Sequence, residues 1–192
     1  MSDISKFISL FEKGQAMANR YEVEFTLPTG VPNGTSGVHM RSTTSRISAI
    51  QRQFNGIGQV NILCHSCTMP MRSVMTYELR QLNAPFRVPY SQTYDPVSFM
   101  FYADSRMFVR QYFDVWQQAV INIKNNTLNF RNEYTADIVI KQLNREGKAS
   151  YAVKLYEAFP IAVTSMEYAY ANSQVQNVSC SIAYKYWEEI AV

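Results

Sequence analysis

The sequence predicts a mainly β protein: an antiparallel β-sandwich or half-barrel with one flanking α-helix at about 104–121 and a short N-terminal helix. Tyr and Phe account for 13 and 11 of the 192 residues, and only 17% of residues are charged, a composition typical of β-rich proteins whose surfaces are partly covered. Alternating apolar and polar runs occur on both sides of a single long stretch with helical spacing. Because the connections between these runs are short, we expect the strands to pair antiparallel.

The chain is most simply a single domain, 1–192, that begins with an amphipathic helix and a strand. The apolar residues with helical spacing are Ile4, Phe7, Ile8 and Phe11. This helix ends before Gly14, and we expect it to dock on its own domain or on a neighbour. The segment YEVEF at 21–25 alternates apolar residues with Glu, which predicts a half-buried strand.

A long loop insertion occupies about 29–59. It is rich in Gly, Pro, Ser and Thr, and it holds three of the 18 basic residues and none of the 15 acidic ones, so the net charge of +3 belongs to it. A loop of this length is uncommon unless it has a function, and we expect it to order against a partner surface. Its candidate contacts with that surface are Arg41, Arg46, Ile47, Ile50, Arg52 and Phe54.

Three strands and the main helix follow the insertion. The strands are VNILCHSCTMP, ending at Pro70, then SVMTYELRQL, then YDPVSFMFYADS, whose Val97, Phe99 and Phe101 point inward. Asp104 is the expected cap of a helix from Ser105 to about Ile121. The stripe of this helix consists of Phe108, Tyr112, Trp116 and Ala119 or Val120, and such a stripe indicates core packing.

The last third predicts two hairpins. In EYTADIVIKQL the even-numbered residues 134–140 are apolar, and YAVKLYEAFP pairs back across a turn at 144–147. TSMEYAYAN and NVSCSIAYKYW are expected to form the second hairpin. On its second strand, Cys180, Ile182, Tyr184 and Tyr186 lie on one side, and Ser179, Ser181 and Lys185 on the other.

No pattern indicates catalysis, a metal or a cofactor, so an enzyme is not expected. The spacing of Cys64 and Cys67 is that of a metal site, but residues three apart in a strand point to opposite faces, which favours structural cysteines. An odd set of three cysteines indicates a reducing compartment. The start has no signal-peptide pattern, and no apolar run is long enough for a membrane anchor. The basic insertion holds a single aromatic residue, Phe54, and lacks the interleaved aromatic and basic residues that stack nucleic-acid bases. Its arginines are therefore expected to meet an acidic protein surface or solvent, with phosphate contacts as the alternative.

Five segments together resemble a known family. They are ANRYEVEF, CTMP, YDPVSFMFYADSRMFVRQYFDVW, QLNREGKASYAVKLYEAFP and SIAYKYW. Their order and spacing resemble the tail tube protein of contractile-tailed, T-even-like myovirus bacteriophages. The resemblance runs from about Met17 to Trp187 and omits the insertion, which lengthens the link between the first two strands.

The resemblance implies hexameric rings whose inner strands close into one β-barrel and which stack into a tube. The implied partners are further copies of the chain, the tail sheath protein, the tape-measure protein, a baseplate tube initiator and a tail terminator, with DNA as a transient passenger. The implied location is the virion, after assembly in the host cytoplasm. Two alternatives share the fold: a baseplate protein that initiates the tube, and the tube protein of type VI secretion. A small-ligand-binding barrel is less favoured, since the strands show no large apolar set beyond a core.

One strand face is the candidate channel wall. Its residues are Thr135, Asp137, Lys141 and Lys154, chosen because the opposite faces of the same strands are apolar enough to be core. A wall that passes DNA must not grip phosphate, since every neutralised phosphate adds affinity. We therefore expect the lysines of this face to be offset by neighbouring Asp or Glu.

Overall fold

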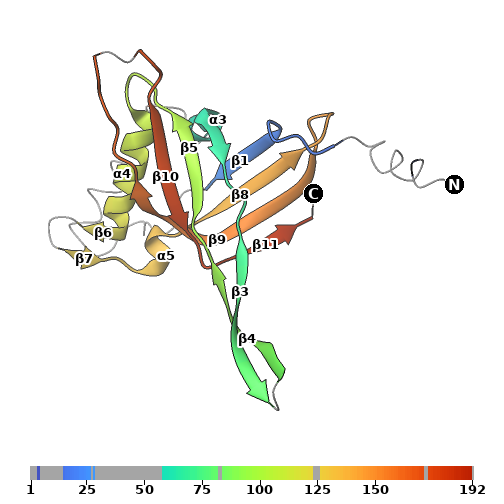
Figure 1. Ribbon diagram of the computed structural model, residues 1–192. Helices are drawn as coiled ribbons and strands as arrows, with labels where there is room; N and C mark the ends of the chain where they lie inside the picture. Colours follow the sequence, from blue (N-terminus) through green and yellow to red (C-terminus); the bar gives the residue numbers. More distant parts are fainter. Residues whose placement is uncertain are drawn as a thin grey trace.

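The computed structural model describes residues 4, 15–26, 28, 58–81, 84–122, 126–170 and 173–191. Two antiparallel sheets pack face to face, helix α4 lies along one side of them, and a two-stranded ribbon projects from the body (Figure 1). The predicted N-terminal helix and almost all of the 29–59 insertion lie outside the described residues.

Seven of the described strands form the body. They are β1 (Tyr21–Phe25), β2 (Cys64–Cys67), β5 (Val97–Tyr102), β8 (Ala136–Leu143), β9 (Ala149–Val163), β10 (Asn177–Ala183) and β11 (Tyr186–Ile190). The order is β1-β8-β9-β10-β5-β2, and β11 pairs with β9. We call β1, β8, β9 and β11 sheet A, and the end of β9 with β10, β5 and β2 sheet B. The predicted sandwich is confirmed, and the described strands do not close into a barrel.

Strand β9 belongs to both sheets because it bends. Its first part pairs with β8 and β11, and its end, from Phe159 to Val163, pairs with β10. At the bend, Glu157 has a positive φ of 51°, and the register with β8 shifts between Ala136 and Ile138. Such a bulge kinks a strand and redirects its side chains, which lets one strand serve two sheets.

The core lies between the inner faces of the sheets. Sheet A contributes fully buried Ile138 and Leu155, and sheet B contributes Phe99 and Phe101. Aromatic contacts join them, with the rings of Phe25 and Phe99 edge to face at 5.2 Å. Each such side chain stabilises the fold by about 1.5–3 kcal/mol through burial. The predicted inward alternation of β5 is confirmed.

Helix α4 (Phe108–Val120) closes one side of the core. Phe108, Tyr112 and Trp116 are buried as predicted, and Trp116 Nε1 donates a hydrogen bond of 2.7 Å to the Tyr134 carbonyl. The helix starts three residues later than expected, because residues 104–107 form a turn that ends in a left-handed Met107. The Asp104 carboxylate still accepts a hydrogen bond of 2.7 Å, from the Phe108 amide.

The remaining elements are short, apart from the ribbon. They are α3 (Gly58–Leu63), β6 (Ile121–Asn122), β7 (Thr127–Leu128) and α5 (Arg131–Tyr134), together with the ribbon strands β3 (Arg72–Gln81) and β4 (Ala84–Tyr94). Residues 60–63, expected to begin a strand, are therefore helical. Strand β4 was not predicted.

The two predicted hairpins had different outcomes. The β8–β9 hairpin is confirmed: Asn144 Oδ1 accepts hydrogen bonds from the Glu146 and Lys148 amides, and Gly147 adopts a φ of 78°. The prediction of the second hairpin is wrong, because residues 164–169 are not a strand and β10 pairs with β5 and β9. Tyr186 does not continue β10 either, because it starts β11 in the other sheet.

Candidate assembly surfaces

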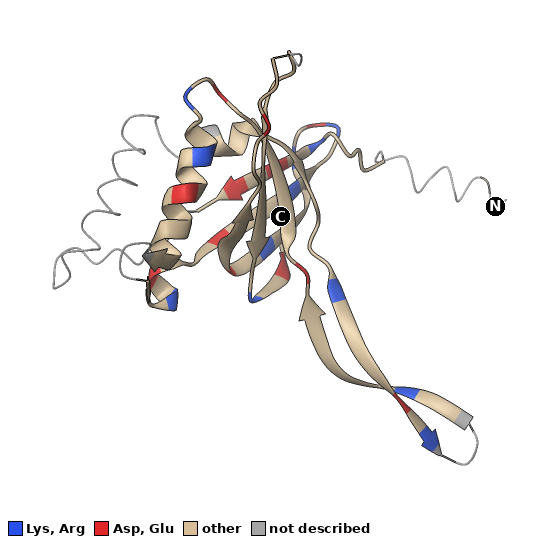
Figure 2. Cartoon of the chain, turned by 60° about the vertical axis from the view of Figure 1, so that its left-hand side comes forward, with Lys and Arg blue, Asp and Glu red and all other residues tan. Residues whose placement is uncertain are grey.

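Every strand of sheet A contains charged residues, and Figure 2 colours them along the ribbon. Those that point away from the core form what we call the charged face, which includes Glu22, Glu24, Asp137, Lys141, Lys154 and Glu188. The Lys141 ammonium pairs with the Glu24 carboxylate across β1 and β8. Lys154 Nζ lies 2.9 Å from Asp137 Oδ2 across β8 and β9. The prediction that lysines of this face are offset by carboxylates is confirmed.

Lys154 has the most developed surroundings on the charged face. Its hydrogen bond with Asp137 raises the pKa of the ammonium above its ordinary value, against the opposing effect of desolvation. Its Nζ also lies 4.8 Å from the centre of the Tyr156 ring, which stacks on Tyr186 at 4.7 Å. This lysine is therefore held in place and already neutralised, so it offers a phosphate little additional attraction.

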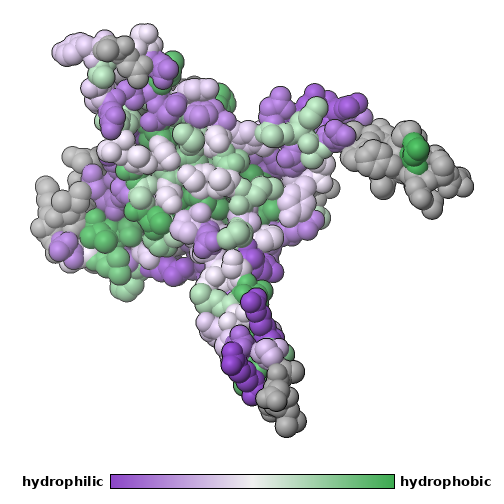
Figure 3. All heavy atoms as spheres, in the orientation of Figure 1, coloured by the Kyte–Doolittle hydropathy of each residue, from purple (hydrophilic) through white to green (hydrophobic). Residues whose placement is uncertain are grey.

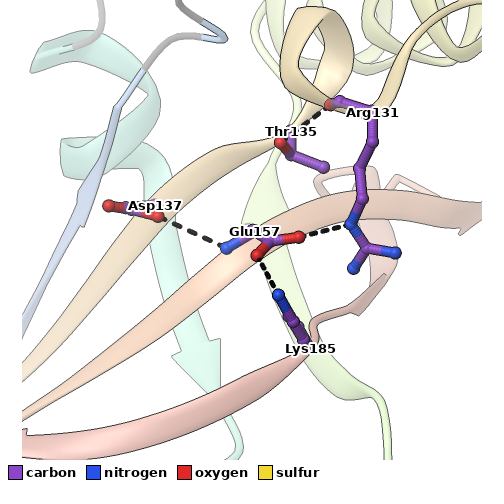
Figure 4. Close-up of polar contacts among 5 residues, drawn as sticks. All are labelled: Arg131, Thr135, Asp137, Glu157 and Lys185. Atoms are coloured by element: carbon purple, nitrogen blue, oxygen red, sulfur yellow. Dashed lines mark hydrogen bonds and ion pairs between the residues drawn. The ribbon is translucent and has the colours of Figure 1, made fainter.

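The bend of β9 carries a second ion cluster (Figure 4). The Glu157 carboxylate pairs with Arg131 of α5 and accepts a hydrogen bond of 2.6 Å from Lys185 Nζ. These two cations lower the pKa of Glu157, with the Lys185 hydrogen bond as the larger cause. Glu157 thus joins α5, β9 and the turn before β11 at the point where the sheets diverge.

Thr135 does not share the charged face. It lies between α5 and β8 with 9% of its surface exposed, and its hydroxyl donates a hydrogen bond of 2.9 Å to the Arg131 carbonyl. The helical turn of α5 ends there, so the alternation of β8 starts one residue later than the sequence suggested. Asp137, Lys141 and Lys154 remain candidates for the channel wall. The candidates in the insertion lie outside the described residues; they are Arg41, Arg46, Ile47, Ile50, Arg52 and Phe54.

Sheet B presents an uncharged outer face. Strands β5 and β10 place Ser98, Met100, Tyr102, Ser179 and Ser181 on it, and neither strand contains an acidic or basic residue. On the neighbouring strand β2, the ring of His65 stacks on Tyr102 at 4.2 Å. The two sheets thus leave chemically different faces uncovered.

The ribbon β3–β4, which we call the arm, was predicted only in part: the expected strand SVMTYELRQL corresponds to β3, whereas β4 and its pairing were not predicted. One side gathers the apolar residues Met75, Tyr77, Leu79, Phe86, Val88 and Tyr90. Phe86 is 47% exposed and Tyr90 61% exposed. The alternation of Phe86, Val88 and Tyr90 could have revealed β4, but Pro85 and Pro89 argued against a strand. Both prolines lie on an edge strand, where a missing amide donor is tolerated.

A smaller apolar patch lies below α4, at β6 and β7. Ile121, Leu128 and Phe130 are 46%, 69% and 81% exposed. Figure 3 shows hydrophobic side chains gathered in this region of the body, away from the arm. No described element of the subunit covers them, so the patch resembles an interface more than a core.

Among the described residues, the cysteines and the cavity beside them give no sign of a reactive centre. A bulge at His65 turns both Cys64 and Cys67 toward the core, correcting the expectation that they face opposite ways. Burial raises the pKa of Cys64 to about 12 and of Cys67 to about 11. Tyr21, Cys67 and Lys141 line a neighbouring cavity of about 330 Å³. Among the described residues, no group of three His, Cys, Asp or Glu could hold a metal, and no helix could cross a membrane.

Comparison with known proteins identifies the family to which the chain with these surfaces belongs. A family model described as phage tail tube protein matches residues 16–190. The chain belongs to the phage tail tube protein family. It is accordingly a structural protein, a subunit of a phage tail tube.

Solved tube structures share the fold of this tail tube protein at low sequence identity. The sheath–tube complex of an extracellular contractile injection system has a chain with a TM-score of 0.58 at 14% identity, over 100% of both chains. The sheath/tube terminator of the same kind of system gives 0.60 at 14% identity, over 94% of this chain and 99% of the other. A chain of the anti-feeding prophage baseplate gives 0.59 at 12% identity, over 92% and 95%. No curated protein matches the sequence of the tail tube protein.

Proposed function

We propose that this chain is the main tube subunit, forming hexameric rings that stack into the inner tube of a contractile phage tail. The tube encloses the tape-measure protein during assembly and later conducts DNA into the host. The chain carries out no catalysis and needs no cofactor. It is assembled in the host cytoplasm and ends in the virion.

The observation that carries this proposal is the unsupported arm. Strands β3 and β4 pair with each other and with no other strand that the structure describes. A two-stranded ribbon alone is marginally stable in water, and this one exposes an apolar side. A second copy of the chain can cover that side, and head-to-tail contacts of this kind generate rings or stacked filaments. We place the basic 29–59 insertion at the same kind of contact between rings.

The proposed partners follow from the assemblies in which the structural neighbours were solved. Those neighbours stand in a sheath–tube complex, a tube terminator and a baseplate. By analogy, this chain is wrapped by a sheath protein, begins on a baseplate initiator and ends on a terminator. DNA is a transient passenger and not a bound ligand.

Two faces are candidates for the channel wall. The charged face, with Asp137, Lys141 and Lys154, is the one predicted from the sequence, and the pairing of its lysines suits passage of DNA. The outer face of sheet B is the alternative, because it has no charge to hold a phosphate and its strands β2 and β5 lead into the arm. We keep the charged face as the proposal and test both.

Assembly is tested by imaging the purified chain. Negative-stain micrographs and sedimentation should show rings and tubes at high concentration with a baseplate nucleus present. Stable monomers alone would contradict the proposal. Copy number then separates the main tube subunit, an abundant band in purified virions, from a baseplate initiator, a faint one.

The wall is tested by cysteine protection in a background carrying Cys64→Ser and Cys67→Ser. Lys141→Cys marks the charged face, and Ser179→Cys marks the face of sheet B. In assembled tubes, a maleimide attached to a large polymer should label Ser179→Cys and spare Lys141→Cys. The reverse pattern would assign the wall to sheet B.

A further inference from the structure

The junction between the body and the arm is a break in strand pairing. Strand β2 ends at Cys67 and β3 starts at Arg72, while β4 ends at Tyr94 and β5 starts at Val97. The Thr68 amide still donates a hydrogen bond of 3.0 Å to the Ser98 carbonyl, but no backbone hydrogen bond between the two strands of the ribbon is found at residues 69–71 and 95–96. The direction of the arm therefore depends on other contacts. Without such contacts, an arm attached through this junction would sweep over a range of angles.

The Arg72 side chain makes three contacts at the root of the arm. The Arg72 guanidinium carbon lies 4.7 Å from the centre of the Trp187 ring and 5.8 Å from that of Tyr94. Its Nη2 also donates a hydrogen bond of 3.3 Å to the Trp187 carbonyl. Tyr94 and Trp187 both pack against the hydrophobic core, so the arginine ties the first residue pair of the arm to the body.

Tyr184 adds a second tie at the same place. It is buried, its ring lies 6.0 Å from that of Tyr94, and its hydroxyl donates a hydrogen bond of 3.4 Å to the Met71 carbonyl. The contacts thus connect the arm, which continues from strands β2 and β5 of sheet B, with β11 of sheet A. They bridge the two sheets across the junction.

We propose that Arg72 is a positioning residue that clamps the arm at one angle to the body, and that tube assembly requires this angle. The assembly half rests on the proposed function, in which the arm contacts a second copy. A planar guanidinium suits the role because it stacks on an aromatic face and donates a directed hydrogen bond together, which an ammonium does less well. A fixed arm also loses less conformational freedom when it docks.

The first test measures the arm in the free subunit, without assembly. Residual dipolar couplings report whether the amides of β3 and β4 share the alignment of the body. In the unaltered chain they should share it. In Arg72→Ala the arm couplings should shrink relative to those of the body, and in Arg72→Lys they should shrink less. Unchanged arm couplings in Arg72→Ala would overturn the proposal.

The second test measures the critical concentration for tube growth with the same variants. Loss of the stacking and hydrogen bond should raise it by about threefold to tenfold for Arg72→Ala, and by less for Arg72→Lys. Arg80→Ala is the matched control, since Arg80 is an arm arginine with an 81% exposed side chain that pairs only with Glu78 among the described residues. It should leave the arm couplings unchanged.

The outcomes separate the clamp from the proposed function. A mobile arm with an unchanged critical concentration would overturn the claim that assembly needs the angle. If the unaltered chain never forms tubes, the proposed function is wrong. The residual dipolar couplings would then test the role of Arg72 in fixing the arm by themselves. A melting temperature of Arg72→Ala equal to that of the unaltered chain would exclude unfolding as the cause.

Discussion

The two long hairpins of this subunit look alike in outline and differ in support. The β8–β9 hairpin places Ile138, Ile140 and Leu155 in the core, each no more than 1% exposed. The arm has a comparable length and an apolar side of its own, yet Phe86 and Tyr90 on that side are about half exposed or more. Strand pairing is present in both hairpins, so burial accounts for the difference in their support, and we expect a partner outside the subunit to cover the arm.

The largest expected difference in the free energy of unfolding is between truncation of a core side chain and truncation of an arm side chain. Leu155→Ala removes a fully buried side chain from β9 and should lower the free energy of unfolding by about 2–5 kcal/mol. Val74→Ala removes a side chain that is 60% exposed and should change it by about 0.5 kcal/mol or less. Denaturant unfolding of the monomer measures both. Equal losses would mean that the arm is packed in the free subunit.

The turn of the β8–β9 hairpin gives a smaller effect. Gly147 has a φ of 78°, and a Cβ added there would meet nothing within 4 Å. The cost of Gly147→Ala is therefore conformational, about 1 kcal/mol or slightly more, because a residue with a Cβ is strained at positive φ. Thermal unfolding should show a drop in melting temperature. A rise would indicate that the turn relaxes to another type.

The ion cluster at Glu157 predicts a pH effect that the arm lacks. Its pKa is lowered in the folded state, so its contribution is fully present above the unfolded pKa near 4.5 and is lost as pH falls through the lower folded value. Glu157→Gln should therefore flatten the loss of stability on the acid side of pH 4.5 and lower stability at neutral pH. Glu78→Gln on the arm should leave the pH profile unaltered, since the Glu78–Arg80 pair is exposed.

Truncation of an exposed apolar residue of the arm should have the smallest effect on stability, and it should still weaken assembly. Phe86→Ala should change the free energy of unfolding by about 0.5 kcal/mol or less, because the ring is already half exposed. Sedimentation should nevertheless show fewer rings and tubes than for the unaltered chain, since the apolar side of the arm is reduced. Normal tube growth in this variant would argue against the arm as an assembly contact.

Deletion of 30–58 extends the same comparison to the insertion. The chain should stay folded, because the confirmed strands and the core helix lie elsewhere, while tube growth weakens. Tubes that grow as readily as those of the unaltered chain would show that the insertion is a decoration.

Local pattern was enough to predict which residues of an element face the core. The inward residues of β1, β5 and β8 follow from a backbone period of two, and the stripe of α4 follows from a period of 3.6. The turn at 144–147 follows from an Asn side chain that accepts amide hydrogen bonds and a Gly that adopts a positive φ. The resemblance of five segments led to the correct family for the same reason, since such segments are local.

Only the tertiary structure decided which distant segments meet. The bend at Glu157 takes β9 from one sheet to the other, and this gives β10 the partner that the sequence reading assigned to residues 164–172. The sequence predicted that Lys154 would lie near a carboxylate, but it did not identify Asp137 as the partner. That choice depends on the register of β8 and β9. Likewise, nothing local places Arg72 over Trp187, 115 residues away. Register and long-range contacts arise from the packing of the whole core. The periodicity of apolar residues along the chain does not determine them.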